Sequence, residues 1–160
     1  MSEPDQPQLD ALQDRLSYQF SDLTLLKRAL THRSAGRQHN ERLEFLGDAV
    51  IGLAAASAFY NRFPDADEGV LSRLRALVVS GHSLAAIARD RDLPSCLILG
   101  ESERKSGGRH RDSILANTLE ALLGAVALDA GPETALHVAG DWLRPAVESA
   151  SPSDTIDAKT

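Results

Sequence analysis

Cysteine and aromatic residues are scarce in this 160-residue sequence. One cysteine, Cys96, is present, and Phe, Trp and Tyr together make up 4% of the residues. A lone cysteine cannot form a disulfide within the chain and cannot supply a cysteine-rich zinc site, which favours a reducing, cytoplasmic compartment. A small domain held together by disulfides is therefore excluded.

An excess of positive charge and a targeting segment are also missing. The chain has 17 basic and 23 acidic residues and a formal net charge of -6, so its composition does not point to a polyanionic partner. The N-terminus, MSEPDQPQLD, lacks a basic run followed by an apolar stretch. The most apolar segment, residues 115–128, is interrupted by Asn117, Thr118 and Glu120. We expect neither export nor membrane insertion.

Strand-like alternation is nearly absent, whereas Ala and Leu recur at spacings of three and four residues. The hydrophobic fraction of 42% is sufficient for one core, and we predict an all-α domain over residues 1–150. The last ten residues, 151–160, are expected to be a flexible tail or the start of a linker. One short extended segment is predicted at residues 96–99. Helices are predicted at residues 8–16, 23–31, 40–61, 68–79, 82–91, 113–130 and 133–149.

Several motifs of common enzymes are missing. The sequence contains no Glu-x-x-His, His-Asp, HExxH, P-loop or Gly-x-Ser-x-Gly motif, and its five histidines lack ligand spacing. These absences argue against di-iron bundles, His-Asp phosphohydrolases, zinc proteases, P-loop enzymes and serine hydrolases.

Three carboxylates lie on one side of the helix predicted at 40–61. Glu41, Glu44 and Asp48 are spaced i, i+3 and i+7, which places them within an arc of about 60°. The arc borders an apolar face, so the carboxylates lie at the margin of a core-facing surface. A solvated acidic face is the alternative interpretation.

A fourth carboxylate, Glu120, lies in a segment that is apolar nearly all round and is therefore predicted to be buried. A buried carboxylate needs a cation, and an ion pair with Arg73 or Arg75 is one alternative. Asn117 lies one turn before Glu120 and extends the same polar face.

Each of the two acidic helices also contains an interior glycine, Gly47 or Gly124. A glycine inside a helix costs on the order of 1 kcal/mol relative to Ala, which favours a close helix crossing at these positions. If the helices cross there, Glu44 and Asp48 would face Asn117 and Glu120. Such an oxygen-only cluster suits Mg²⁺ and phosphodiester hydrolysis.

Two further segments could contact an anionic substrate. Residues 104–111, RKSGGRHR, form a glycine-containing basic stretch leading into the helix of Glu120, with Lys105, Arg109 and Arg111 as candidate phosphate contacts. A solvated loop is the alternative. In residues 31–34, THRS, His32 and Arg33 could bind phosphate or ribose oxygens, although the same residues would also suit the end of a helix.

These segments together resemble the endonuclease domain of the ribonuclease III family, over about residues 9–150. The resemblance is carried by ERLEFLGD at 41–48, THRS at 31–34, FPDADEG at 63–69 and KSGGRHRDSILANTLEALLGA at 105–125.

The resemblance implies an all-α endonuclease that acts as a homodimer on double-stranded RNA. The expected cofactor is Mg²⁺, for which Mn²⁺ can substitute, and no organic cofactor or membrane partner is expected. The expected products carry 5′-phosphate and 3′-hydroxyl ends with short 3′ overhangs. Expected processes are rRNA, tRNA and mRNA processing and mRNA decay.

The same resemblance assigns roles to individual residues. Asp48 and Glu120 are expected to be central to the chemistry, Glu41 and Glu68 are accessory acids, and Phe45 contributes to the dimer contact. The expected metal ligands are Glu44, Asp48, Asn117 and Glu120.

The chain departs from the family pattern in two respects. Asn117 stands where the family usually has Asp, so the site keeps an amide oxygen but loses one negative charge. A catalytically impaired module that dimerises and binds RNA without efficient cleavage is therefore the alternative function. Bacterial members also usually continue into a double-stranded RNA-binding domain, so the linker expected at 151–160 would lead into a domain that this sequence lacks. A naturally single-domain member of the family is the alternative.

Overall fold

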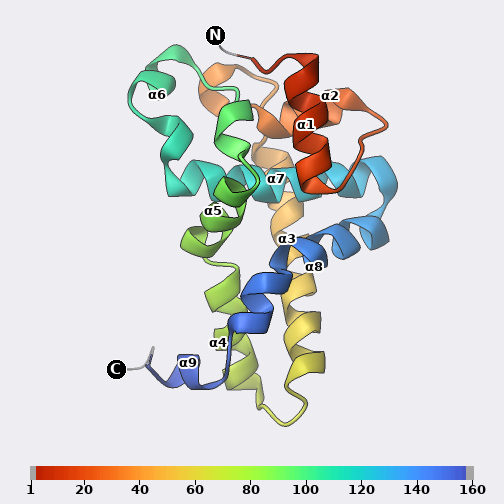
Figure 1. Ribbon diagram of the computed structural model, residues 1–160, viewed down its shortest axis with the longest axis vertical. Coiled ribbons are helices and arrows are strands. Elements are labelled where there is room, and N and C mark those ends of the chain that lie inside the picture. Colours follow the sequence, from red (N-terminus) through yellow and green to blue (C-terminus); the bar gives the residue numbers. More distant parts are fainter. Residues whose placement is uncertain (1–2, 158–160) are drawn as a thin grey trace.

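The computed structural model describes residues 3–157, which fold into α-helices joined by short loops (Figure 1). This confirms the predicted all-α fold. The α-helices are α1 Gln6–Leu16, α2 Leu23–Leu30, α3 Glu41–Arg62, α4 Glu68–Val78, α5 Gly81–Asp90, α6 Glu101–Lys105, α7 Asp112–Ala130, α8 Pro132–Ser149 and α9 Ser153–Asp157. Three short 3-10 helices are η1 Arg33–Ala35, η2 Leu93–Cys96 and η3 Gly108–His110.

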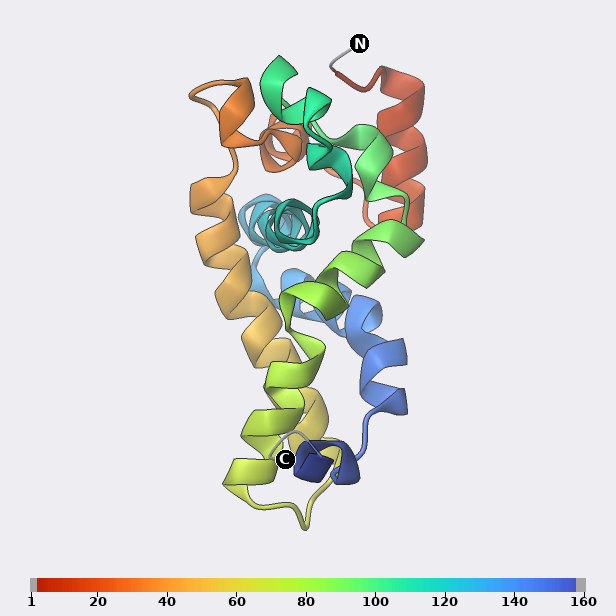
Figure 2. The ribbon, with the colours of Figure 1, turned by 90° about the vertical axis from the view of Figure 1, so that its left-hand side faces the viewer.

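Helix α7 lies at the centre of the upper half of the molecule. Figure 2 looks along this helix and shows α2, α3 and α5 around it. Nearly every side chain from Ile114 to Val126 is buried, as expected for a segment that is apolar all round. The C-terminal half of α3 extends away from α7 and packs against α4 and α8.

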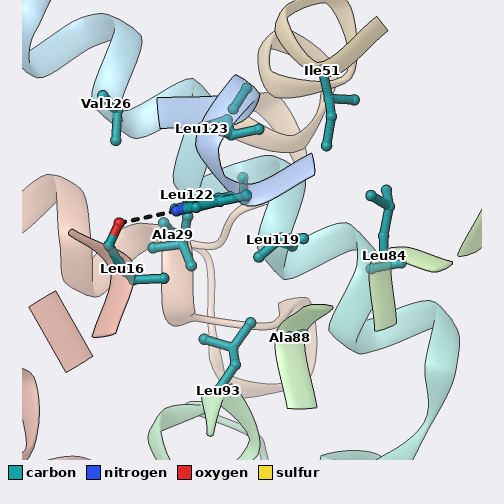
Figure 3. Close-up of a cluster of buried hydrophobic side chains, with 14 of the residues drawn as sticks. Leu16, Ala29, Ile51, Leu84, Ala88, Leu93, Leu119, Leu122, Leu123 and Val126 are labelled. Atoms are coloured by element: carbon teal, nitrogen blue, oxygen red, sulfur yellow. Dashed lines mark hydrogen bonds between the residues drawn. The ribbon is translucent and has the colours of Figure 1, made fainter. Parts of the chain in front are cut away.

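The core around α7 is built from leucine, alanine and isoleucine side chains contributed by several helices (Figure 3). The Trp142 indole nitrogen on α8 donates a hydrogen bond of 2.9 Å to the carbonyl oxygen of Leu16 at the end of α1. The largest buried side chain therefore also satisfies a backbone acceptor at a helix end.

Helices α3 and α7 cross in close contact at two glycines. A Cβ atom on Gly47 would lie 1.6 Å from the Glu120 carbonyl oxygen, and one on Gly124 would lie 2.2 Å from the Leu43 carbonyl oxygen. No other residue type fits at this separation, so the helix-weakening glycines are explained by backbone proximity. The crossing brings the two acidic segments together.

The segment predicted to be extended pairs with the end of α2. Thr31 and Ile98 form an isolated parallel bridge, with hydrogen bonds of 2.9 Å from the His32 amide to the Ile98 carbonyl and from the Ile98 amide to the Leu30 carbonyl. This pairing fixes the loop that precedes α3 beside the loop that precedes α6.

The structure adds detail to the predicted helices. Asn40 immediately precedes α3 but makes no side-chain cap on it, and its amide nitrogen donates to the Ala29 carbonyl at 2.9 Å. The basic stretch at 104–111 is not only loop, since α6 and η3 fall within or beside it. Residues 153–157 form the short helix α9 within the expected flexible tail, with Thr155 buried. Residues 158–160 of that tail lie outside the described residues.

Helices α3 and α7 are long and apolar enough to cross a membrane by length and composition alone. In the structure these two helices pack against each other, and 67% of the apolar window of α7 is buried inside the protein. Their hydropathy is thus accounted for by the core of the helical domain.

Candidate functional site

A polar pocket of about 230 Å³ opens beside the N-terminal end of α3. It lies between α3, the start of α7, η1 and α6, and these elements meet because the Thr31–Ile98 bridge joins the two loops. The charged and amide side chains that line it are Arg33, Asn40, Glu41, Glu44, Glu103, Arg111 and Asn117, with His32 beside them.

Two carboxyl groups meet where α3 crosses α7. The Glu120 side chain is 8% exposed and lies within hydrogen-bonding reach of Asp48, which is exposed, and Glu44 is close enough to add its charge. Burial, followed by the hydrogen bond and charge of Asp48 and the charge of Glu44, raises the pKa of Glu120 to about 8. The raised pKa favours the protonated form of Glu120 at neutral pH when no metal is bound.

The pKa of Glu44 is also raised. Partial burial is the main cause, and the charges of Glu41 and Asp48 act in the same direction while Arg33 opposes them. Glu44, Asp48 and Glu120 thus form a carboxyl cluster in which the charge of one group disfavours ionisation of its neighbours.

No arginine or lysine among residues 3–157 forms an ion pair with Glu120, and Arg73 and Arg75 lie on α4. The alternative of a buried arginine–glutamate pair is therefore wrong for the described part of the chain. Among residues 3–157, no ion pair involves Glu44, Asp48 or Glu120.

The donor set fits a hard divalent cation that keeps much of its water. Within the described residues no group of three or more His, Cys, Asp and Glu side chains is placed to hold a metal ion together. Mg²⁺ usually binds proteins through one or two carboxylates and retains several waters. Asp48 and Glu120 can supply these two carboxylates, and Glu44 and Asn117 are oxygen donors on the adjoining pocket wall.

Two glutamates at the pocket are paired with arginines. Glu41 contacts Arg33 at 3.3 Å, with both side chains largely exposed. Glu103 forms an ion pair with Arg111, whose guanidinium also donates to the Ser106 carbonyl at 3.2 Å. Glu103 is absent from the residues predicted from sequence, because it immediately precedes the basic stretch that begins at Arg104.

The other predicted basic contacts differ in their availability. Arg109 donates from one guanidinium nitrogen to the carbonyls of Pro94 at 2.9 Å and Leu97 at 3.0 Å, so this side chain ties η3 to η2. Lys105 is exposed and pairs with Glu101 one turn earlier at 2.9 Å. Of the three cations in residues 105–111, Arg111 alone lines the polar pocket.

Glu68 is not brought to the carboxylate cluster of its own chain. It is the first residue of α4, beyond the far end of the 22-residue α3, whereas Glu41 begins that helix (Figures 1 and 2). Glu68 instead lies beside Tyr60 and Arg75 in a separate shallow pocket.

An apolar groove lies on the other side of the start of α3. Phe45 is 83% exposed, and the groove beside it is lined mainly by Leu25, Leu43, Leu46 and Leu128. An exposed phenylalanine next to an apolar groove is typical of an interaction surface.

The sequence and the fold match those of known nucleases. The family described as Ribonuclease-III-like matches residues 22–146. Two structures of the nuclease domain of ribonuclease III from Campylobacter jejuni are similar at 40% and 38% identity, with TM-scores of 0.83 and 0.84. The aligned regions cover 86% and 89% of this chain and 96% and 98% of those chains.

A more distant similarity is to Dicer from Pichia stipitis, at 29% identity and a TM-score of 0.61. It covers 81% of this chain and 57% of the Dicer chain. The family match and the fold therefore define a nuclease domain. The chain belongs to the ribonuclease III family.

Proposed function

We propose that this chain is a Mg²⁺-dependent endoribonuclease that hydrolyses phosphodiester bonds of double-stranded RNA. The observation that carries the proposal is the meeting of Asp48 and Glu120, next to Glu44, at a helix crossing. No ion pair within residues 3–157 involves any of these three carboxylates. The products would have 5′-phosphate and 3′-hydroxyl ends with short 3′ overhangs. The proposed setting is cytoplasmic processing of rRNA, tRNA and mRNA.

The carboxylate cluster and the adjoining polar pocket have separate tasks in this proposal. Asp48 and Glu120 would hold the metal, with Glu44 and Asn117 as nearby oxygen donors. Mg²⁺, or Mn²⁺ in its place, would supply charge neutralisation at the scissile phosphate and activate water. Arg111 lies at the pocket wall, where its guanidinium could contact the RNA backbone.

We further propose that the active form is a homodimer. The similar nuclease domain of C. jejuni ribonuclease III has a region involved in dimer formation, and that region is structurally flexible. In this chain, Phe45 and the adjacent apolar groove offer a surface for a second copy. Glu68 cannot join the carboxylate cluster of its own chain, so any role in cleavage requires a second copy to bring it there.

The deciding experiment measures cleavage of long double-stranded RNA at low salt, with and without Mg²⁺. The chain is compared with its Asn117→Asp variant and with Glu120→Gln, and single-stranded RNA is the substrate control. We expect metal-dependent cleavage restricted to duplex RNA, faster with Asn117→Asp and abolished by Glu120→Gln. Cleavage that persists in Glu120→Gln would overturn the proposed site.

A second candidate function rests on Asn117, because an amide at this position gives the pocket one negative charge fewer than an Asp would. A chain that binds duplex RNA and cleaves it only after Asn117→Asp would be an impaired nuclease acting as a binding module. Binding without cleavage by both chains would favour a noncatalytic role for the whole domain.

A further inference from the structure

The His32 ring is held by the residue two positions later in the chain. The Ser34 backbone amide donates to His32 Nδ1 at 3.1 Å, and the Ser34 hydroxyl oxygen lies 2.8 Å from the same nitrogen. A backbone amide can only donate, so Nδ1 must offer a lone pair. A proton on Nδ1 would point at another donor.

The orientation of the Ser34 hydroxyl is set by a second loop. The Gly100 backbone amide donates to the Ser34 hydroxyl oxygen at 2.9 Å, which leaves the hydroxyl proton free to be donated to His32 Nδ1. Gly100 is required for this contact, since a Cβ atom there would lie 2.2 Å from the Ser34 carbonyl oxygen. The hydrogen bonds therefore run in one direction, from the Gly100 amide to the Ser34 hydroxyl and from that hydroxyl to His32 Nδ1.

This chain of donors places the ring proton of neutral His32 on Nε2. His32 lines the polar pocket, and Nε2 hydrogen-bonds to none of the residues between 3 and 157. Burial lowers the pKa of His32, with Arg33 and His39 acting in the same direction and Glu103 and Glu41 opposing. The neutral ring is consistent with the geometry of its contacts.

We infer that Gly100 and Ser34 fix His32 as a neutral Nε2–H donor to a backbone oxygen of RNA in the polar pocket. The inference rests on the proposed function. His32 is thus a binding residue that recognises a phosphate oxygen or a ribose 2′-hydroxyl, and it does not supply a positive charge. A phosphate and a ribose 2′-hydroxyl both offer an oxygen atom that can accept this hydrogen bond.

The first test is the tautomer itself, which needs no RNA. Nitrogen NMR of the His32 ring should show protonated Nε2 and unprotonated Nδ1 from pH 8 down to pH 6.5. The Ser34→Ala variant should shift the ring toward a mixture of tautomers, whereas His137, which is exposed on α8, should be unaffected. A wild-type His32 with the proton on Nδ1 would overturn the inference.

The second test distinguishes the role of the His32 Nε2 donor from that of the Nδ1 acceptor. His32→Asn retains an acceptor near the position of Nδ1 but lacks the distal donor, whereas His32→Gln retains a donor near the position of Nε2. Binding of a short RNA duplex without metal should weaken about tenfold in His32→Asn, the effect of one hydrogen bond, and much less in His32→Gln. His137→Gln is the matched surface control. Equal binding by His32→Asn and wild type would overturn the role of His32.

Chemically altered duplexes identify the acceptor. If the acceptor is a 2′-hydroxyl, one 2′-deoxy substitution will remove the advantage of wild type over His32→Asn. If the acceptor is a phosphate oxygen, wild type will still bind more tightly than His32→Asn after every 2′-deoxy substitution. A phosphorothioate at the contacted phosphate will change that difference in affinity. Failure of wild type and the Asn117→Asp variant to bind any duplex RNA would overturn the proposed function, and the NMR result would still report on the tautomer.

Discussion

The backbone of Glu120 lies so close to Gly47 that a Cβ atom at position 47 would be 1.6 Å from the Glu120 carbonyl oxygen. The carboxyl group of Glu120 therefore meets that of Asp48 only because α3 lacks a side chain at position 47. The packing of the helices and the assembly of the acidic site depend on the same contact.

Gly47→Ala should consequently destabilise the protein by about 3 kcal/mol or more, because the helices must separate to accommodate the methyl group. The free energy of unfolding from urea titration measures the effect. Gly52→Ala is the matched control, since Gly52 lies on the same helix and a Cβ there would meet no neighbouring group within 4 Å outside the adjacent backbone of that helix. The Gly52→Ala substitution should raise the free energy of unfolding by up to about 1 kcal/mol. Equal effects of the two substitutions would contradict the close crossing.

The raised pKa of Glu120 predicts how stability varies with pH when no metal is bound. In the folded chain this pKa is about 8, against an ordinary value of 4.5. Between these values the folded chain holds a proton that the unfolded chain has lost, so stability falls as pH rises from about 5 to 8. Glu120→Gln should flatten this dependence and be more stable than wild type above pH 8.

Urea unfolding at several pH values without divalent metal tests this prediction. Glu68→Gln, at an exposed position, should follow the wild-type curve. Adding Mg²⁺ should restore stability to wild type at high pH and release about one proton at pH 7, because the metal binds the ionised carboxylate. A wild-type curve parallel to that of Glu120→Gln would show that the pKa of Glu120 is not raised.

The helices and the acidic crossing could be predicted from the sequence because both follow from local periodicity. The spacing of Glu44 and Asp48 and the interior glycines are readable in single segments. The pairing of Glu103 with Arg111 and the position of Glu68 depend on which loops meet after folding. Local pattern does not contain that information, so these contacts could not be predicted.

Arg109 and Arg111 are two residues apart, but the structure predicts that removing Arg109 affects mainly stability and removing Arg111 affects mainly RNA binding. Arg109→Ala removes the guanidinium that donates to the carbonyls of Pro94 and Leu97, so stability should fall by about 1–3 kcal/mol. Arg111→Ala removes an arginine that is partly exposed at the pocket, so RNA binding should weaken with little loss of stability. The salt dependence of its RNA binding should also be shallower by about one unit in log–log slope.

Thermal unfolding and RNA binding at several salt concentrations separate these two effects. Lys105→Ala is a useful control, because Lys105 is exposed and does not line the polar pocket. A normal melting temperature for Arg109→Ala together with weakened RNA binding would show that Arg109 contacts RNA directly.

The exposure of the Phe45 side chain is not explained by packing within one copy of the chain. It is 83% exposed beside the groove lined by Leu25, Leu43, Leu46 and Leu128. Burying a phenylalanine contributes about 1.5–3 kcal/mol, and a symmetric dimer would bury two of them. Phe45→Asp should therefore weaken dimerisation at least about 100-fold while leaving the fold intact.

Sedimentation velocity over a range of protein concentrations measures this change. Ile156→Asp is the control, since Ile156 is a 65% exposed aliphatic residue on α9, at the other end of the molecule. If Phe45→Asp is monomeric, its cleavage activity should fall as well, because Glu68 can reach a carboxylate cluster only from another copy of the chain. A monomeric Phe45→Asp variant with full activity would mean that one chain contains every group needed for cleavage and that Glu68 has no part in it.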